Sequence, residues 1–593
     1  MKKALILLLI ASSFLFRSCL KQDKEWIRIN QLGYREKDIK VAVYMGYSKL
    51  DLRSFRLVEV TSGKTVLEKN EMIKSEPLTP FESCYRLPFT EFSEEGIYRI
   101  EAGNAVSPDF RISNDIYNGT ADFLLFYMRQ QRCGFNPYIK DSCHTHDGYV
   151  IYGGSSDSSH INVTGGWHDA ADYLQYVATS ANAAYQMLFA FSENPASFGD
   201  KYIDNGLQGK DNIPDILNES KWGLDWLLKM NPAPGIMYNQ IADDRDHIGF
   251  RFPNMDTANY GMGSERPVYR CTGKQQGLFK YRNRATGIAS TAGKFASAFA
   301  RGAAVYKSID PEFSDLLAAK AVSAFSYGLG NPGACQTAPG TAPYFYEEDN
   351  WTDDMELAAI ELYRLTKDKK YLNHAVDFGR REPVTPWMGS DTARHYQWYP
   401  FINMGHPGIA SYADEDPVRQ EFLANMEEGL QRIMVRGEKN PFLIGVPFIW
   451  CSNNLVAATL TQAHLFTEIS GDTLFAELEA AHRDWLFGCN PWGTSMIVGL
   501  PAGGDYPDNT HSSFVVKGEQ VPGGLVDGPV YPTIFSNLKY IYLSQEDEYA
   551  EFQTRLAVYH DDYADYSTNE CTMDGTASLI YYLSALQNET IAE

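Results

Sequence analysis

The stretch Thr-Gly-Gly-Trp-His-Asp-Ala-Ala-Asp-Tyr at residues 164–173 decides how the chain is interpreted. Its two glycines permit a tight turn where a side chain would clash. Two carboxylates, Asp169 and Asp172, follow and lie three residues apart. If a helix begins near Asp169, both carboxylates share one face at its positively polarised N-terminus, which favours the ionised form that a general base needs. Spacing alone does not separate such a base from a helix cap.

A second acidic stretch, Tyr-Ala-Asp-Tyr-Ser-Thr-Asn-Glu-Cys-Thr-Met-Asp, occupies residues 563–574. Both stretches combine carboxylates with aromatic residues, and sugar sites pair acids with flat apolar faces. Hydrolysis of a glycosidic bond needs two carboxyls, one to protonate the leaving oxygen and one to activate water or attack carbon. The two distant stretches therefore favour catalysis over capping, provided that they meet in space.

Together the stretches resemble the paired signatures of glycoside hydrolase family 9, Gly-Gly-Trp-(Tyr/His)-Asp-Ala-Gly-Asp and Asp-Tyr-x-x-Asn-Glu. Only Ala171 departs from the first signature, and the second fits from Asp565 through Glu570. The resemblance implies that Asp172 is the general base, Asp169 its companion at the attacking water, and Glu570 the general acid. That acid must stay protonated near neutral pH, which calls for apolar or like-charged surroundings. The family inverts, so the base and acid carboxyls should lie roughly 6.5–9.5 Å apart.

The resemblance also suggests residues that contact sugar. His511, in Tyr-Pro-Asp-Asn-Thr-His-Ser-Ser at 506–513, resembles the histidine of the family's Pro-His-His-Arg segment, which grips the sugar beside the broken bond. The second histidine and the arginine of that segment are missing here, which leaves the substrate open. Apart from the resemblance, Tyr566 and Trp398 are aromatic candidates for stacking on a sugar. The alternatives are a loop histidine without a role and aromatic rings that only pack in the core.

Four residues have the types of a closed tetrahedral zinc site, namely Cys133, Cys143, His144 and His160. Relatives that carry an immunoglobulin-like domain often hold a structural zinc through a Cys, a Cys-His pair and a His upstream of the Gly-Gly-Trp motif. His160 stands in that last place, with His146 as the spare. A Cys133–Cys143 disulfide or two free thiols is the alternative. Calcium is common in the family, although no loop here has its regular ligand spacing. No cofactor is expected for catalysis.

Length and charge limit the class of protein. A chain of 593 residues is too long for one core and predicts two to four domains. The net charge of -23 argues against nucleic acid or an anionic membrane surface as a partner. A neutral polysaccharide is indifferent to that charge.

The N-terminus reads as an export signal over residues 1–19. Met-Lys-Lys precedes an apolar run at 4–16 that is too short to span a bilayer comfortably. The run ends at Arg17-Ser18-Cys19, which looks like a bacterial lipoprotein cleavage site with Cys19 as the lipidated residue, although Arg17 fits that site poorly. We expect an outer-membrane or periplasmic lipoprotein that meets the membrane only through its lipid. The alternative is a secreted protein with a cleaved signal and no lipid.

The rest of the chain divides by periodicity into a β-like part at 20–113 and a helical part at 114–593. Short alternating runs with turns between them predict a β-sandwich in the first part. Its segment Asn-Gln-Leu-Gly-Tyr at 30–34 resembles the opening of the immunoglobulin-like domain in one branch of the family. In the second part, helical periodicity predicts about a dozen helices, one of them over 171–191. Small residues at 287–293 suit a helix that packs closely against others. The resemblance implies an all-α (α/α)6 barrel.

The sequence therefore predicts a multi-domain enzyme, an immunoglobulin-like β-sandwich followed by an (α/α)6 barrel. It is expected to hydrolyse internal β-1,4-glucosidic bonds with inversion, in cellulose-like glucan, xyloglucan or mixed-linkage glucan. An exo-acting β-glucosidase or glucosaminidase of the same family is the first alternative. A surface glycan-binding protein without catalysis is the second, and retention of all three acidic residues argues against it.

Overall fold

The computed structural model describes residues 24–343, 346–413, 416–538 and 541–592. The expected signal and Cys19 lie outside these residues. Within the part that is described, no helix combines the length and the apolar character needed to cross a bilayer.

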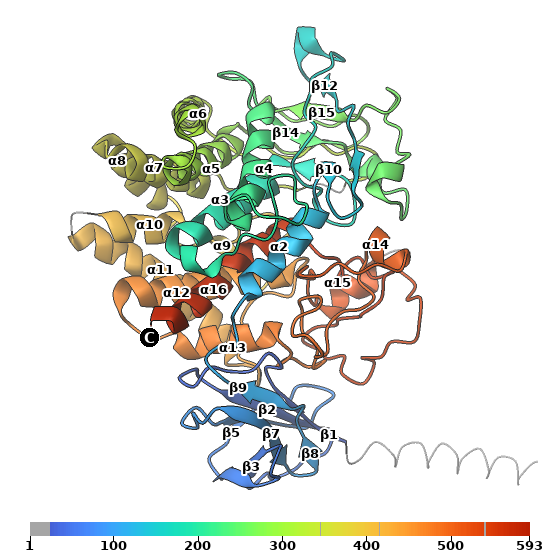
Figure 1. Cartoon of the computed structure of the whole chain (residues 1–593), viewed down its shortest axis with the longest axis vertical. Helices are drawn as coiled ribbons and strands as arrows, with labels where there is room; N and C mark the ends of the chain where they lie inside the picture. Colours follow the sequence, from blue (N-terminus) through green and yellow to red (C-terminus); the bar gives the residue numbers. More distant parts are fainter. Residues whose placement is uncertain (1–23, 344–345, 414–415, 539–540, 593) are drawn as a thin grey trace, which may run out of the picture.

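The first domain is a sandwich of two antiparallel sheets (Figure 1). One sheet has the order β1-β2-β6-β5 and consists of β1 (Glu25–Arg28), β2 (Val41–Gly46), β6 (Ser83–Pro88) and β5 (Ile73–Ser75). The other has the order β4-β3-β7-β8, with β9 paired to β7, and consists of β4 (Thr65–Lys69), β3 (Phe55–Glu59), β7 (Gly96–Ala102), β8 (Ala105–Val106) and β9 (Phe110–Ile112). Alternate residues of β7 are buried between the sheets, as period-two patterning requires.

The second domain is a double ring of helices. The inner helices are α3 (Val177–Glu193), α5 (Ala289–Tyr306), α7 (Thr352–Thr366), α10 (Gly405–Tyr412), α12 (Ser452–Ser470) and α16 (Met573–Ala592). Each inner helix contacts the next, and α16 contacts α3, which closes the ring. Each also contacts one outer helix, and these are α2 (Thr120–Gln130), α4 (Asp215–Met230), α6 (Pro311–Gly330), α8 (Lys369–Gly379), α11 (Asp416–Gly437) and α13 (Ala476–Leu486). This is the (α/α)6 arrangement that was predicted.

Small residues let the inner helices approach closely. A Cβ atom added at Gly293 of α5 would lie 2.7 Å from the backbone of Asp354 in α7, closer than real Cβ atoms come. The helix expected over 171–191 begins later, at Val177. Helix α10 was not predicted, because its glycines and Pro407 read as breakers.

The connections between helices carry further short elements. They comprise a sheet of order β12-β15-β14-β13, a hairpin and short helices. The sheet contains β12 (Tyr149–Ile151), β15 (Pro267–Arg270), β14 (Tyr238–Ile241) and β13 (Gln175–Tyr176), and the hairpin β10 (Gly134–Asn136) and β11 (Asp141–Cys143). The short α-helices are α9 (Pro386–Gly389), α14 (Ser513–Val516) and α15 (Pro532–Asn537). The 3-10 turns are η1 (Gly154–Ser156), η2 (Pro195–Ser197), η3 (Asp244–Asp246) and η4 (Pro253–Met255).

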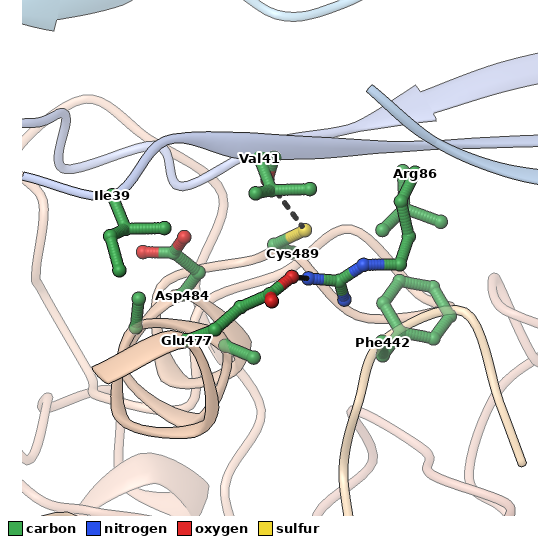
Figure 2. Close-up of a pocket in the computed structure, with 10 residues that line it drawn as sticks. Ile39, Val41, Arg86, Phe442, Glu477, Asp484 and Cys489 are labelled. Carbon is green, nitrogen blue, oxygen red and sulfur yellow. Dashed lines mark hydrogen bonds and ion pairs between the residues drawn. The ribbon is translucent and has the colours of Figure 1, made fainter. Parts of the chain in front are cut away.

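The sandwich packs against the barrel at α13, at the loop that follows α13 and at the connection between α11 and α12. Figure 2 shows Arg86 of β6 extending over Phe442 toward Glu477 of α13, where the ion pair measures 2.5 Å. Val43 and Phe81 of the sandwich belong to the same buried apolar cluster as the barrel core. The sandwich is thus an integral support of the barrel, and it contributes none of the described residues that line the cavity below.

Candidate active site

The first acidic stretch is a loop rather than a helix start. Gly165 and Gly166 adopt φ values of 125° and 72°, which only glycine accepts readily. A Cβ at Gly166 would lie 2.7 Å from the Trp226 ring of α4. Trp167 is fully buried and donates its indole N–H to Glu219 of α4 at 2.7 Å. Packing on α4, and not a helix dipole, therefore sets the course of this loop.

Asp169 is buried beneath the cavity. One carboxylate oxygen accepts the Thr179 hydroxyl at 2.6 Å and the other accepts the Tyr346 hydroxyl. Its backbone oxygen accepts the Met573 N–H at 3.0 Å, at the start of α16. Burial raises the pKa of Asp169 well above its usual range, and neighbouring carboxylates add to the effect. These contacts fix both the carboxyl and the loop backbone.

The two distant acidic stretches meet. The Ala171 N–H donates to Glu570 Oε1 at 2.9 Å, one residue before Asp172. Asp172 and Glu570 both line a cavity of about 580 Å³. Burial raises the pKa of Glu570 well above its usual range, and the charges of Asp527 and Asp172 raise it further. The cavity therefore holds a carboxyl kept protonated beside one that is partly open to solvent.

The remainder of the second stretch builds the loop that carries Glu570. Asp565 is fully buried and accepts hydrogen bonds from the Ser567 and Thr568 hydroxyls at 2.6 and 2.7 Å. Asn569 donates to the backbone of Asn509 at 2.9 Å. The acidic residue Asp565 therefore shapes the turn, and Glu570 is the carboxyl of this stretch that reaches the cavity.

Aromatic rings and a histidine form the opposite wall. His511 and Tyr566, two residues singled out from the sequence, line the cavity. His511 Nδ1 donates to the Tyr563 backbone oxygen at 2.6 Å, and burial lowers the pKa of His511, so that Nε2 is left as an acceptor. Trp450 also lines the cavity, with its ring stacked 5.8 Å from that of Tyr566. The two rings together form a flat apolar face on the cavity wall.

Trp398 does not belong to this wall. It is half-buried and packs against the barrel core, outside the described residues that line the cavity. Its neighbour Tyr399 is buried as well. The residues just before Trp398 contact the cavity wall from behind, because His395 packs on Trp450 with ring centroids 5.7 Å apart. The sequence places aromatics near the site without showing which rings turn inward.

A loop after β14 supplies cavity residues that were not singled out from the sequence. His247, Phe250 and Arg251 line the cavity together with Asp246. The only sequence signal for them is the length and polarity of the connection at 243–284, which marks a binding loop without naming its members. His247 Nε2 lies 3.5 Å from Asp172 Oδ2.

Beside the cavity, Cys133, Cys143, His144 and His168 place one sulfur or ring nitrogen each within 4.8 Å of one another. Both cysteines are free thiols rather than a disulfide. The prediction of His160 as the fourth member is wrong. Its ring faces Glu265 at 3.5 Å and is 53% exposed.

His168 takes the place expected for His160 because the first acidic stretch pairs with the chain near Cys133. The Cys133 N–H donates to the Gly166 backbone oxygen at 2.9 Å, which brings His168 beside the thiol. Two thiols and two imidazoles form a donor set that fits zinc. His144 Nε2 is in turn held 3.0 Å from Asp256 Oδ2, the kind of carboxylate partner that orients a ligand histidine.

Comparisons with known proteins agree with this geometry. Residues 117–583 match the model of glycosyl hydrolase family 9, and residues 22–107 match that of the cellulase N-terminal ig-like domain. A cellodextrinase of Butyrivibrio fibrisolvens is 25% identical over 498 residues, which cover 80% of this chain and 84% of that protein. Endoglucanase D of Acetivibrio thermocellus is 24% identical over 537 residues, which cover 86% and 73%.

Among solved structures, a metagenome-derived endoglucanase of the family superposes with a TM-score of 0.73 at 25% identity. The superposition covers 95% of this chain and 99% of that one. The family model spans most of the chain, including both acidic stretches and the cavity between them. The chain therefore belongs to glycosyl hydrolase family 9, as a glycoside hydrolase with an N-terminal immunoglobulin-like domain.

Proposed function

We propose that the protein is an inverting endo-β-1,4-glucanase in which Asp172 is the general base and Glu570 the general acid. The observation that carries this proposal is the hydrogen bond from Ala171 to Glu570, which joins the two acidic stretches across one cavity. Family membership and the names of the relatives support a β-1,4-glucan as substrate.

The reaction needs two proton transfers. Asp172 accepts a proton from water as the water oxygen attacks the anomeric carbon, while Glu570 gives its proton to the departing glycosidic oxygen. The raised pKa of Glu570 keeps that proton available at neutral pH. Asp169, fixed by two hydroxyl groups, supports the base and its water. Trp450 and Tyr566 provide a stacking face, and His511 offers a hydrogen-bond acceptor.

A reducing-sugar assay on soluble β-glucans tests these roles. Glu570→Gln removes the donated proton and Asp172→Asn removes the acceptor, and each is expected to lose about 100- to 10,000-fold in kcat. Glu468→Gln, an exposed glutamate on α12, is the matched control and should retain wild-type activity. Equal activity of Glu570→Gln and the wild type would remove the assignment. NMR of the first product should show the α-anomer, and the β-anomer would refute inversion.

Analysis of the products distinguishes the candidate substrates and shows whether the enzyme attacks internal bonds or chain ends. An endo-acting enzyme releases a range of oligosaccharides from cellulose-like glucan, xyloglucan or mixed-linkage glucan, and viscosity falls before reducing sugar accumulates. An exo-acting enzyme releases only glucose or glucosamine, and the similarity to a cellodextrinase makes short oligosaccharides the necessary comparison. Binding of glucan without any hydrolysis would leave only the glycan-binding alternative.

For the cluster beside the cavity, we propose a structural zinc held by Cys133, Cys143, His144 and His168. A bound zinc would cross-link the hairpin β10–β11 to the catalytic loop, and no step of the reaction passes through it. Elemental analysis of the purified protein should find about one zinc per chain, reduced in Cys133→Ser but retained in His160→Gln. A calcium site stays a prediction of the family resemblance.

We also propose export with a lipid on Cys19. Cells producing the full chain should carry it in the membrane fraction, and Cys19→Ser should move it to the soluble exported fraction. A wild-type protein found only in the soluble exported fraction would favour a cleaved signal without lipid.

A further inference from the structure

We propose that Asp256 is a positioning residue that couples sugar binding in the cavity to metal binding at the Cys/His cluster, which consists of Cys133, Cys143, His144 and His168. One carboxylate oxygen of Asp256 contacts a histidine of the cluster, and the other contacts an arginine of the cavity wall. The proposal rests on the proposed glucan substrate and the proposed zinc, and it adds a linkage between the two sites that neither requires.

The cluster end of this connection is the imidazole of His144. Its Nδ1 faces the cluster, 3.2 Å from His168 Nε2 and 3.8 Å from Cys133 Sγ. Its Nε2 faces away from the cluster and lies 3.0 Å from Asp256 Oδ2. A metal bound at Nδ1 needs that nitrogen unprotonated, so the ring hydrogen then lies on Nε2 and is donated to Asp256. Metal binding therefore fixes both the tautomer of His144 and its hydrogen bond to Asp256.

Without a metal, the single ring hydrogen of a neutral His144 has two competing places. It can lie on Nδ1 and be donated to His168 Nε2, or lie on Nε2 and be donated to Asp256. In the first tautomer, the lone pair of Nε2 faces the carboxylate of Asp256, and two acceptors then repel each other. The contact between His144 and Asp256 thus has two states, and a metal at the cluster selects one of them.

The cavity end is the guanidinium of Arg251. Its Nε donates to Asp256 Oδ1 at 2.5 Å, its Nη2 to Asp246 Oδ1 at 2.8 Å and its Nη1 to the Gly249 backbone oxygen at 3.0 Å. A guanidinium has more N–H groups than these contacts use. Because Arg251 lines the cavity, the remaining N–H groups are available to sugar hydroxyls.

The two carboxylates that hold Arg251 are attached to different parts of the chain. Asp246 accepts the Tyr173 N–H at 2.8 Å, whereas Asp256 contacts His144 of the cluster. The side chains of His144, Asp256 and Arg251 are only 5%, 7% and 12% exposed, so solvent screens their contacts little. A change in the hydrogen bond at His144 therefore alters the hold of Asp256 on one edge of the guanidinium, while Asp246 keeps the other edge in place.

The turn that carries Asp256 is docked on the hairpin of the cluster. Asn254 in η4 donates its side-chain N–H to Asp141 Oδ2 at 2.8 Å, and Asp141 begins β11, which ends at Cys143. Asp256 Oδ1 also accepts the Ala258 N–H at 2.8 Å. Asp256 is therefore held beside the hairpin and reaches from there to the cavity wall.

Titration calorimetry with cellotetraose measures the linkage in the Glu570→Gln background, where the sugar is not consumed. We expect the zinc-loaded protein to bind cellotetraose about fivefold or more tighter than the zinc-free protein. Linkage is reciprocal in binding free energy, so saturating cellotetraose should tighten zinc binding by the same factor in competition with a chelator. Circular dichroism checks that the zinc-free protein is folded.

Asp256→Asn should abolish the linkage although both ligands still bind. Its zinc affinity should fall about 10- to 100-fold, the usual effect of losing the partner of a ligand histidine. At saturating zinc, it should bind cellotetraose no tighter than the zinc-free parent does. Arg251→Met should also abolish the linkage, with the zinc affinity in the absence of sugar near that of the parent.

Glu265→Gln is the matched control. Glu265 also faces a histidine, with His160 at 3.5 Å, and neither is among the described residues that line the cavity. This variant should keep the full linkage. If the zinc-free protein does not fold, the zinc-loaded variants decide, because Asp256→Asn should bind cellotetraose more weakly than the parent and Glu265→Gln should not.

The outcomes separate this inference from the proposed function. Equal affinity of the zinc-loaded and zinc-free proteins for cellotetraose, or failure of the parent to bind zinc or cellotetraose, would overturn the proposal. Full linkage in Asp256→Asn would also overturn it and would place the coupling in His168, which belongs to the loop at 164–173. Normal activity of Glu570→Gln, or no hydrolysis of any glucan by the wild type, would instead remove the proposed function.

Discussion

Lys294 should contribute several kcal/mol to the free energy of unfolding, because its ammonium is buried between two acids. It lies on α5, 4% exposed, with Nζ 2.9 Å from Glu348 Oε2 and 2.7 Å from Asp354 Oδ2. Burial opposes its charge, but Asp354 and Glu348 hold the pKa of Lys294 above its usual range. Lys294→Met keeps the volume of the side chain and leaves one buried negative charge without a partner. Removal of one partner of a buried pair costs about 3–5 kcal/mol.

Proton uptake sets an upper limit on that cost. To protonate a carboxyl of ordinary pKa near 4 at pH 7 takes about 4 kcal/mol, from about 1.4 kcal/mol per pH unit, and at pH 5 about 1.5 kcal/mol. Burial already raises the pKa of both Glu348 and Asp354, so the folded variant binds protons more readily than the unfolded chain. The folded variant therefore gains stability as pH falls, and its deficit should shrink from about 4 to about 1.5 kcal/mol between pH 7 and pH 5.

Urea unfolding followed by tryptophan fluorescence at both pH values measures the deficit. Lys221→Met is the matched control, because Lys221 pairs with Asp225 at 2.9 Å on the surface of α4, where the lysine is 38% exposed. That variant should lose less than about 1 kcal/mol. A deficit for Lys294→Met no larger than that of Lys221→Met at pH 7, or one that grows toward pH 5, would refute the reasoning.

Four further substitutions test the cavity. Tyr346→Phe removes a hydroxyl bonded to the buried Asp169, and kcat/KM should fall about 3- to 10-fold, since a typical hydrogen bond contributes about 0.5–1.5 kcal/mol. Unchanged kinetics would contradict this. Trp450→Ala should raise KM for oligosaccharides, whereas Trp398→Ala should leave KM unchanged, and the reverse pattern would exchange their roles. Asp527→Asn removes a charge that raises the pKa of Glu570, so the basic limb of kcat/KM should move to lower pH, and an upward shift would be inconsistent with that charge.

The sequence motifs single out Asp172 and Glu570, which both line the cavity, but the motifs do not predict the backbone that carries them. The roles proposed for these two residues rest on carboxyl chemistry, which is local to the side chain. A helix start near Asp169 was the wrong expectation, since positive φ values at two glycines and the burial of Trp167 on α4 hold the segment as a loop. Those causes are tertiary contacts, which local propensity does not contain.

The Cys/His cluster and the cavity wall illustrate the same limit. His160 precedes the motif and His168 lies within it. The backbone pairing of Cys133 with Gly166 decides which of the two imidazoles lies beside the thiols. Likewise, His247 carries no motif, and its place beside Asp172 follows from a single buried aspartate that joins two loops. Sequence patterns indicate the chemistry that a side chain can perform. Long-range backbone pairing decides which other side chains lie next to it.

The loop at 164–173 is held by hydrogen bonds to several distant segments, although it lacks the hydrogen bonds of a helix. His168 donates its backbone N–H to the Gln131 backbone oxygen at 2.8 Å, Ala171 donates to Glu570, and Tyr173 donates to Asp246. Each partner belongs to a different part of the chain, so no single local opening releases the loop. Precise catalytic geometry usually requires regular elements as a base. Here the geometry comes from many distant attachments instead, and changes far from the cavity, such as in α4 beneath the loop, should therefore alter catalysis before they unfold the barrel.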